Sequence, residues 1–333
     1  MTSAPAIQHV VLACDESGAK GYADRDEQVL GEVGVFAGIM VPGELLTTAQ
    51  ATFDAIAARY QTSPGKVHIT DLAPGQQAKL REEMFQLITE LRLPCFFEAV
   101  HVAGFHVFFR RFERQIKSAQ EQRQSRIKLS LRGPTPDSLH VALFFGLYSK
   151  LLAFCMERDR CDLHVEVRTD QVDDPIFKDF QASARKLLDF GATVNRVTGF
   201  DPDTKQVLKG TVETAEVPPE HRLPITIHQL DFRRVKHLDG LVLAADVLAN
   251  SLAYLYRTRP PKERYRRLNR PESVAAHPLA LSLDAFNDWG AFDASDLLYP
   301  HPCDPDAVRQ TPWYRRWLRY LECWIREWRI PAA

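Results

Sequence analysis

The sequence predicts an α/β protein in which helices flank a mixed β-sheet. Residues 8–14 are apolar on both alternating faces, which is typical of a central strand covered on both sides. In the second half of the chain, strand-like and helical patterns alternate. The 333 residues, 45% of them hydrophobic, are enough to bury a core in one large domain or two average ones.

The first half of the chain predicts three strands and two helices. The strand-like runs are residues 8–14, Val33–Val41 and Cys95–Val102. Apolar residues at helical spacing predict helices over Thr47–Tyr60 and Gln76–Leu91, with a short extended piece at 66–69 between them.

In the second half, a basic helix is expected over 104–132 and an apolar helix over Asp137–Glu157. Cys161–Thr169 alternates as a strand does, and a helix at about 174–189 follows. Strand-like pieces near 193–198 and 225–230 are separated by a polar insert that fits a hairpin, and Leu238–Tyr256 is a strongly apolar helix. We therefore expect a domain of residues 1–257 with a helical insert at about 104–158. A basic connector and a Trp-rich C-terminal helical extension would occupy 258–333.

Several classes of protein are excluded by composition. The best apolar stretch, Val141–Met156, is interrupted by Ser149 and Lys150, so we expect no membrane span, and the N-terminus shows no secretory signal. Six scattered cysteines without metal-site spacing predict reduced thiols in a cytoplasm, with neither a zinc site nor a disulfide scaffold. The motifs of phosphate-binding and dinucleotide-binding loops are missing from the sequence.

Basic residues are concentrated in two segments, although the net charge is −1. The candidate nucleic-acid contacts are Arg110, Arg111, Arg114, Arg126 and Lys128 in segment 110–132, and Arg264, Arg266 and Arg267 in segment 257–270. Such local density can neutralise a polyanion whatever the global charge. The alternative is a solvated helix face and a charged loop.

Carboxylates stand where chemistry is expected in an α/β protein. Asp15, followed by Glu16, and Asp170 end two buried strands, and ligands of open sheets collect beyond the carboxyl ends of strands. Asp246 lies in a helix that is apolar on nearly every side, where an unpaired carboxylate needs a metal, a cation or a proton. The alternatives are turn or helix caps for Asp15 and Asp170, and an ion pair with an arginine for Asp246.

Taken together, Asp15, Asp170 and Asp246 predict a site for Mg²⁺ or Mn²⁺, because these hard cations prefer carboxylate oxygen. Two such ions can steady both the attacking and the leaving oxygen of a phosphodiester. Ribonuclease H-like nucleases use the same order of acids: one on the first strand, one on a later strand and one on a late helix.

The chain resembles the bacterial family called domain of unknown function 3800 over about residues 8–257. The likeness rests on Asp-Glu-Ser-Gly at 15–18, a strand ending in Val41-Pro42, the segment 67–72 and Ala-Asp-x-x-Ala at 245–249. It implies a ribonuclease H-like fold and a metal-dependent nuclease of mobile-element or anti-phage gene contexts. Asp15, Asp170 and Asp246 would form its acidic set, with Glu16 as a fourth member.

Two further features remain open. His68, with Asp71 nearby, is a candidate general base or substrate contact. Four tryptophans at helical spacing between 313 and 329 predict a helix that stacks on bases, docks a partner protein or packs on its own domain.

We therefore expect a cytoplasmic, divalent-metal-dependent nuclease. The first alternative is a catalytically quiet nucleic-acid-binding or adaptor subunit, and a weaker one is a hydrolase of small phosphate esters. The sequence decides neither between DNA and RNA nor between endo- and exo-cleavage.

Overall fold

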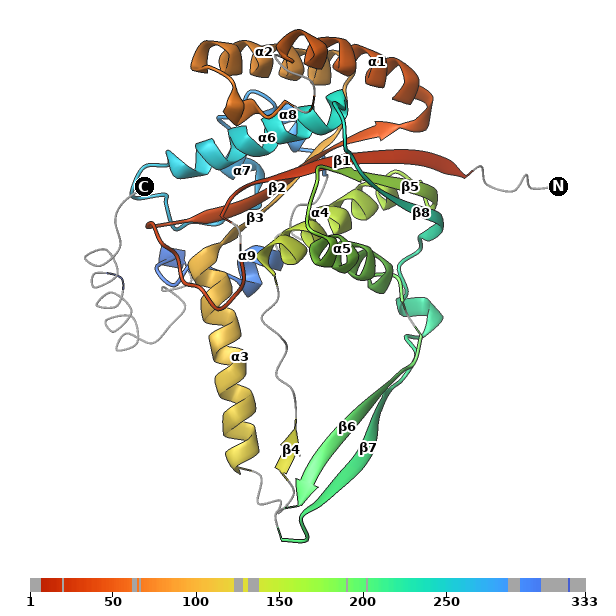
Figure 1. The fold of residues 1–333 in the computed structure, drawn as a ribbon, viewed down its shortest axis with the longest axis vertical. Coiled ribbons are helices and arrows are strands. Elements are labelled where there is room, and N and C mark those ends of the chain that lie inside the picture. The colour runs from red at the N-terminus through yellow and green to blue at the C-terminus, as the bar shows by residue number, and fades with distance from the viewer. Residues whose placement is uncertain are drawn as a thin grey trace, which may run out of the picture.

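A five-stranded sheet in the order β3-β2-β1-β5-β8 lies at the centre of the molecule (Figure 1). The computed structural model describes residues 7–19, 21–61, 65, 67–122, 128–130, 138–189, 191–201, 203–286, 294–306 and 323. The five strands are β1 (Gln8–Gly18), β2 (Val33–Pro42), β3 (Cys95–His101), β5 (Asp162–Thr169) and β8 (Thr226–Arg234). β1, β2 and β3 pair antiparallel, whereas β5 pairs parallel with β1, and β8 with β5. The predicted mixed sheet is confirmed.

Three helices, α1 (Gly43–Tyr60), α2 (Pro74–Glu90) and α6 (Gly240–Arg257), form the layer above the sheet in Figure 1. On this side Val11 and Ala13 of β1 belong to one core with Phe53 and Leu248. The short helices α7 (Pro271–Val274) and α8 (Ala280–Leu283) contribute to the same core. Residues beyond 257 are therefore built into the packing of this face.

The opposite face of the sheet is covered by α4 (Leu139–Met156) and α5 (Asp174–Lys186) (Figure 1). Leu12 and Cys14 of β1, which alternate with Val11 and Ala13, point into this second core. Both faces of β1 are thus buried, which explains its unbroken apolar sequence. Within the described residues, α4 alone is long and apolar enough to cross a membrane, but 56% of it is buried inside the fold, as in a core helix.

An arm extends from this body (Figure 1). It consists of α3 (Val102–Gln122) and a second sheet in the order β4-β6-β7, made of β4 (Lys128–Ser130), β6 (Thr193–Asp201) and β7 (Gln206–Thr214). The strand-like pieces expected near 193–198 and 225–230 are confirmed as β6 and β8. The hairpin expected in the insert between them is instead formed by β6 together with β7, and the 3-10 turn η2 (Pro219–His221) precedes β8. The prediction of one helix through residue 132 is wrong at 128–130, because this segment pairs with β6.

The start of α6 is fixed against α1. Asp239 caps the helix by accepting the N–H groups of Leu241 and Val242, and Asp54 of α1 accepts the Gly240 N–H at 2.7 Å. A side chain at position 240 would collide with the backbone of Phe53, so only glycine allows this close approach. These contacts determine how α6 lies along the sheet and where Asp246 is placed.

Buried polar contacts connect the C-terminal segment to the body. Asp296 of α9 (Ala294–Leu298) accepts the N–H groups of Leu268 and Asn269, and His301 lies 3.2 Å from the buried carboxylate of Glu27. Cys303 and Cys323 form a disulfide with a Cα–Cα distance of 5.7 Å. The expectation of six reduced thiols is therefore wrong for this pair, since the chain brings together two cysteines that no motif connects.

Lys150 of α4 forms a buried ion pair with Glu98 of β3. The lysine Nζ lies 2.8 Å from Glu98 Oε2, and it donates to the carbonyl oxygen of Phe97 and to Asn269 Oδ1. The lysine that interrupts the apolar run of α4 therefore neutralises an acid inside the core.

We predict that Lys150→Met costs about 3–5 kcal/mol of unfolding free energy, because it leaves the Glu98 charge buried without a cation. Urea denaturation measures this cost. The double variant Lys150→Met/Glu98→Gln should regain part of the loss. A single variant that is as stable as the double variant would contradict this interpretation.

Candidate functional site

The parallel pairing of β1 with β5 brings two predicted acids to one edge of the sheet. Cys14 and Thr169 are the last paired residues of the two strands, and Asp15 and Asp170 follow them directly. Ligands of α/β sheets bind beyond such carboxyl ends. Asp15 is only 6% exposed, so its charge is largely removed from water.

Asp246 reaches the same place from α6. Its Oδ2 accepts the backbone N–H of Ile69 at 2.9 Å and lies 3.8 Å from Nδ1 of His68. The expected extended piece at 66–69 gives way at Ile69 to a 3-10 turn, η1 (Ile69–Asp71), which directs this N–H at Asp246. Within the described chain, these groups, and not an arginine, are the partners of Asp246, so the ion-pair alternative is not supported.

His68 connects the acids. Its Nε2 lies 3.5 Å from Asp170 Oδ2, while its Nδ1 faces Asp246. Asp15, His68, Asp170 and Asp246 line one cleft of about 20 Å³, which is room for about one water-sized particle. The structure thus brings together four of the predicted site residues. His237 also lines this cleft, and no sequence pattern singles it out.

The carboxylates of this cleft are held in an unfavourable environment. Burial raises the pKa of Asp15 well above its usual range, and the charges of Glu16 and Asp246 raise it further. Burial also raises the pKa of Asp246, although the Ile69 N–H and His68 oppose this shift. Neighbouring negative charges therefore disfavour ionisation of both acids, and a proton or a cation would relieve the repulsion.

Glu16 lies beside this group. A hydrogen bond between its side chain and that of Asp15 contributes to the raised pKa of Asp15, and its Oε1 lies 3.7 Å from Nε2 of His140 on α4. Glu16 does not line the cleft, although its charge affects the pKa of Asp15 and Asp246. His140 was not predicted, because a single histidine in an apolar helix gives no signal.

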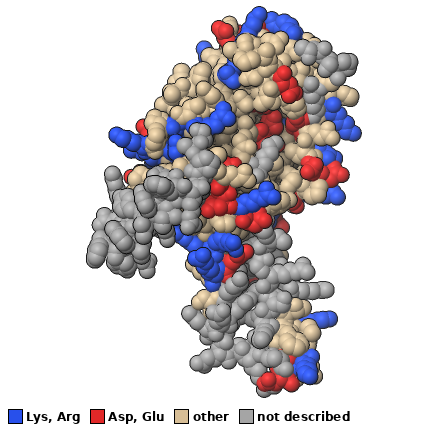
Figure 2. Space-filling view, turned by 60° about the vertical axis from the view of Figure 1, so that its left-hand side comes forward, with Lys and Arg blue, Asp and Glu red and all other residues tan. Residues whose placement is uncertain are grey.

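The predicted basic residues are spread over several parts of the molecule. Arg110, Arg111 and Arg114 lie on α3, which extends away from the sheet (Figure 1). Arg266 and Arg267 lie in the loop after α6, where the Arg266 carbonyl contacts His101 and the Arg267 carbonyl accepts from Arg259. Arg126, the side chain of Lys128 and the segment 313–329, apart from Cys323, lie outside the described residues. Acidic and basic side chains are interspersed over the face shown in Figure 2.

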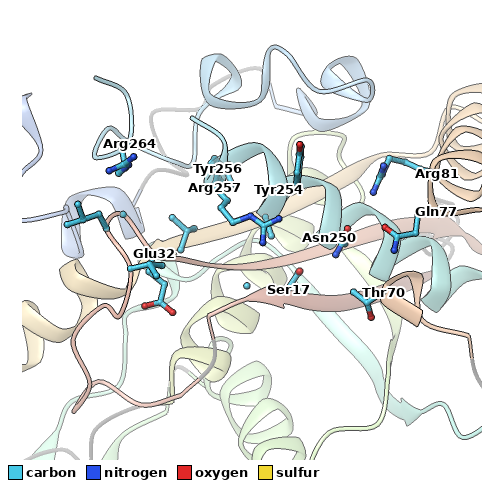
Figure 3. A pocket seen from close by; sticks show the side chains of 16 residues that line it. Ser17, Glu32, Thr70, Gln77, Arg81, Asn250, Tyr254, Tyr256, Arg257 and Arg264 are labelled. Atoms are coloured by element: carbon cyan, nitrogen blue, oxygen red, sulfur yellow. The ribbon is translucent and has the colours of Figure 1, made fainter. Parts of the chain in front are cut away.

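A larger pocket of about 490 Å³ adjoins the acidic cleft and contains Arg264 (Figure 3). Its wall includes Ser17, Thr70 and Asn250. They follow the cleft residues Asp15, His68 and Asp246 by two, two and four residues, respectively. The sequence does not identify Arg81 or Gln77 of α2 as part of a site, because amphipathic spacing alone does not show which polar side chains border a cavity.

The donor chemistry of the cleft fits a hard divalent cation. Asp15, Asp170 and Asp246 offer carboxylate oxygens from three elements, and burial makes the charges of Asp15 and Asp246 costly without a counter-ion. No three His, Cys, Asp or Glu side chains in the described ranges converge closely enough to form a metal-binding group. Between Asp170 and Asp246 lies the imidazole of His68.

No family model and no curated protein matches the chain. A functional assignment therefore depends on the geometry and the charges of the cleft.

We predict that Mn²⁺ or Mg²⁺ raises the melting temperature of the wild-type protein. A ligand that binds only the folded state stabilises it by about 2.7 kcal/mol at a concentration 100 times its Kd. Asp15→Asn should instead raise the melting temperature without metal, because it removes a buried charge, and should abolish the response to metal.

Differential scanning calorimetry in EDTA and in each cation measures both effects. Asp162→Asn, at the opposite end of β5, is the matched control and should keep the metal response. An equal metal response in the wild type and in Asp15→Asn would contradict a cation site at Asp15.

Proposed function

We propose that the protein is a divalent-metal-dependent nuclease with a ribonuclease H-like fold. The observation that carries this proposal is the convergence of Asp15, Asp170 and Asp246 on one cleft. They come from the end of the first strand, the end of a later parallel strand and a late helix. This is the order of acids that ribonuclease H-like nucleases use.

The sequence resemblance to the domain-of-unknown-function 3800 family supports the same proposal. Both of its end motifs border the cleft: the Asp-Glu-Ser-Gly motif supplies Asp15, and the Ala-Asp-x-x-Ala motif supplies Asp246. His68, from the segment 67–72 that also carries the likeness, lies between two of the acids. A role in mobile-element or anti-phage defence is part of the proposal through this resemblance.

In the proposed reaction, water attacks the phosphorus of a phosphodiester and one P–O bond breaks. Mg²⁺ or Mn²⁺ would neutralise charge on the phosphate and steady its attacking and leaving oxygens. Asp15 and Asp246 would hold the cation, and Asp170 would complete the set. The side chain of His68 is 43% exposed, so it can pass a proton between the cleft and solvent through Nδ1 or Nε2.

The cytoplasm is the proposed place of action. Cys14, Cys95, Cys155 and Cys161 are free thiols, as expected there. The disulfide between Cys303 and Cys323 is the exception, because such bonds are rare in the cytosol of most organisms.

A nuclease assay tests the proposal. Wild-type protein should cleave at least one of four labelled substrates, single- or double-stranded DNA or RNA, in Mg²⁺ or Mn²⁺, and should lose activity in EDTA. Loss of a residue that only supports a metal ligand lowers activity by roughly 10- to 100-fold. Asp15→Asn and Asp246→Asn, which remove proposed ligands, should each lower the rate by more than this. Asp162→Asn should leave the rate unchanged.

Cleavage that persists in either cleft variant or in EDTA would refute the assignment. Binding of nucleic acid without cleavage in any metal would favour the alternative, a catalytically quiet nucleic-acid-binding or adaptor subunit. A saturable rate on small phosphate esters alone would favour the weaker alternative, a hydrolase of small phosphate esters.

A further inference from the structure

We propose that the 490 Å³ pocket beside the acidic cleft binds an unpaired nucleotide of a single-stranded nucleic acid next to the scissile phosphate. This inference rests on the proposed function and names its substrate class. It is carried by the position of the pocket, by its charge and by one exposed aromatic ring.

The pocket continues the acidic cleft along the same three segments. β1 provides Asp15 to the cleft and Ser17 to the pocket, two residues further along the same strand face. α6 provides Asp246 and then Asn250, about 6 Å along the helix axis. The turn that follows His68 provides Thr70. A strand whose phosphate lay at the carboxylates would therefore place its next nucleotide in this pocket.

Cations dominate the charge of the pocket wall. The wall contains three arginines, Arg81, Arg257 and Arg264, and only one carboxylate, that of Glu32. Within the described part of the chain, no salt bridge is formed by any of the three arginines, and Nε of Arg81 is buried without a hydrogen-bond partner. Guanidinium groups without a carboxylate partner are suited to phosphate oxygens, which they bind in bidentate fashion.

The backbone is shaped to let Arg264 reach the pocket. Gly31 has a φ of +71°, and a Cβ on it would collide with the side chain of Arg264. Figure 3 shows Arg264 and Glu32 at one end of the pocket, Arg81 and Gln77 at the other, and Asn250 and Tyr254 between them. Positive charge thus lies at both ends of the pocket.

Tyr254 offers a surface for a base. It is 57% exposed on α6, and the Arg257 guanidinium lies 5.6 Å from its ring centroid. Bases stack on exposed aromatic rings when a strand is unpaired, whereas a duplex keeps its bases stacked on each other. The pocket volume is that of a small-ligand site, which a base enters only after leaving a helix. The combination favours a single strand over a duplex.

Binding measured by fluorescence anisotropy in EDTA tests this inference without cleavage. The probes are labelled 12-mers of dT and of U, and a DNA duplex of the same length. Wild-type protein should bind at least one single strand about tenfold more tightly than the duplex. Tyr254→Ala should weaken single-strand binding about tenfold, and Tyr254→Phe, which keeps the ring, by less than about twofold.

The arginines are tested by salt dependence. The slope of log K against log salt is negative. Arg81→Gln and Arg257→Gln should each make it less steep by about 0.7, as loss of one phosphate contact on a single strand does. Arg185→Gln on α5, which covers the other face of the sheet, is the matched control and should leave the slope unchanged. Circular dichroism and the melting temperature confirm that each variant is folded.

Equal affinity for single strand and duplex, or unchanged affinity in Tyr254→Ala, overturns the inference. The binding assay in EDTA does not depend on the proposed nuclease function. In this assay Asp15→Asn should bind single strands at least as tightly as the wild type. Loss of binding in Tyr254→Ala in a protein that cleaves nothing supports the pocket and rejects the nuclease. Cleavage that depends on Asp15 with unchanged binding in Tyr254→Ala supports the nuclease and rejects the pocket.

Discussion

The parallel pairing of β1 with β5 is the constraint on which the site depends. Strands that run in the same direction end at the same edge, so Asp15 and Asp170 lie side by side only because β5 pairs parallel with β1. A slip of one residue would turn one of these acids to the opposite face of the sheet. The alternate residues of β1 pack into two different cores, one on each face of the sheet.

The second requirement is the placement of α6. Gly240 and Asp54 fix its first turn against α1, and Asp239 caps it, so Asp246 faces the strand ends six residues later. The result is two acids whose pKa values are raised by burial, with the charge of Asp246 raising that of Asp15 further. The raised pKa values of these acids occur beside a pocket whose wall contains three arginines, and the proposed cation site and nucleic-acid contact both depend on this arrangement.

The sequence predicted the sheet, most helices and four residues of the cleft, because these depend on local patterns: apolar runs, helical spacing and acids at strand ends. The disulfide of Cys303 and the turn at Ile69 were missed, since each depends on chain segments meeting in space. Glu16 interacts with Asp15 as its position in the sequence suggests, but the sequence did not show that it lies outside the lining of the cleft and next to His140. Helical periodicity also did not predict the pocket or show that Arg81 borders it.

Asp15, Asp170 and Asp246 are proposed to form a site for a divalent cation, and the proposed chemistry depends on that site. Anomalous diffraction from crystals grown with Mn²⁺ tests it most directly, because the signal locates manganese independently of any assay. We predict an anomalous peak in contact with the carboxylates of Asp15 and Asp246, and none at this place in crystals of Asp15→Asn. A wild-type structure with Mn²⁺ bound elsewhere, and with His68 still between Asp170 and Asp246, would contradict a cation site in the cleft.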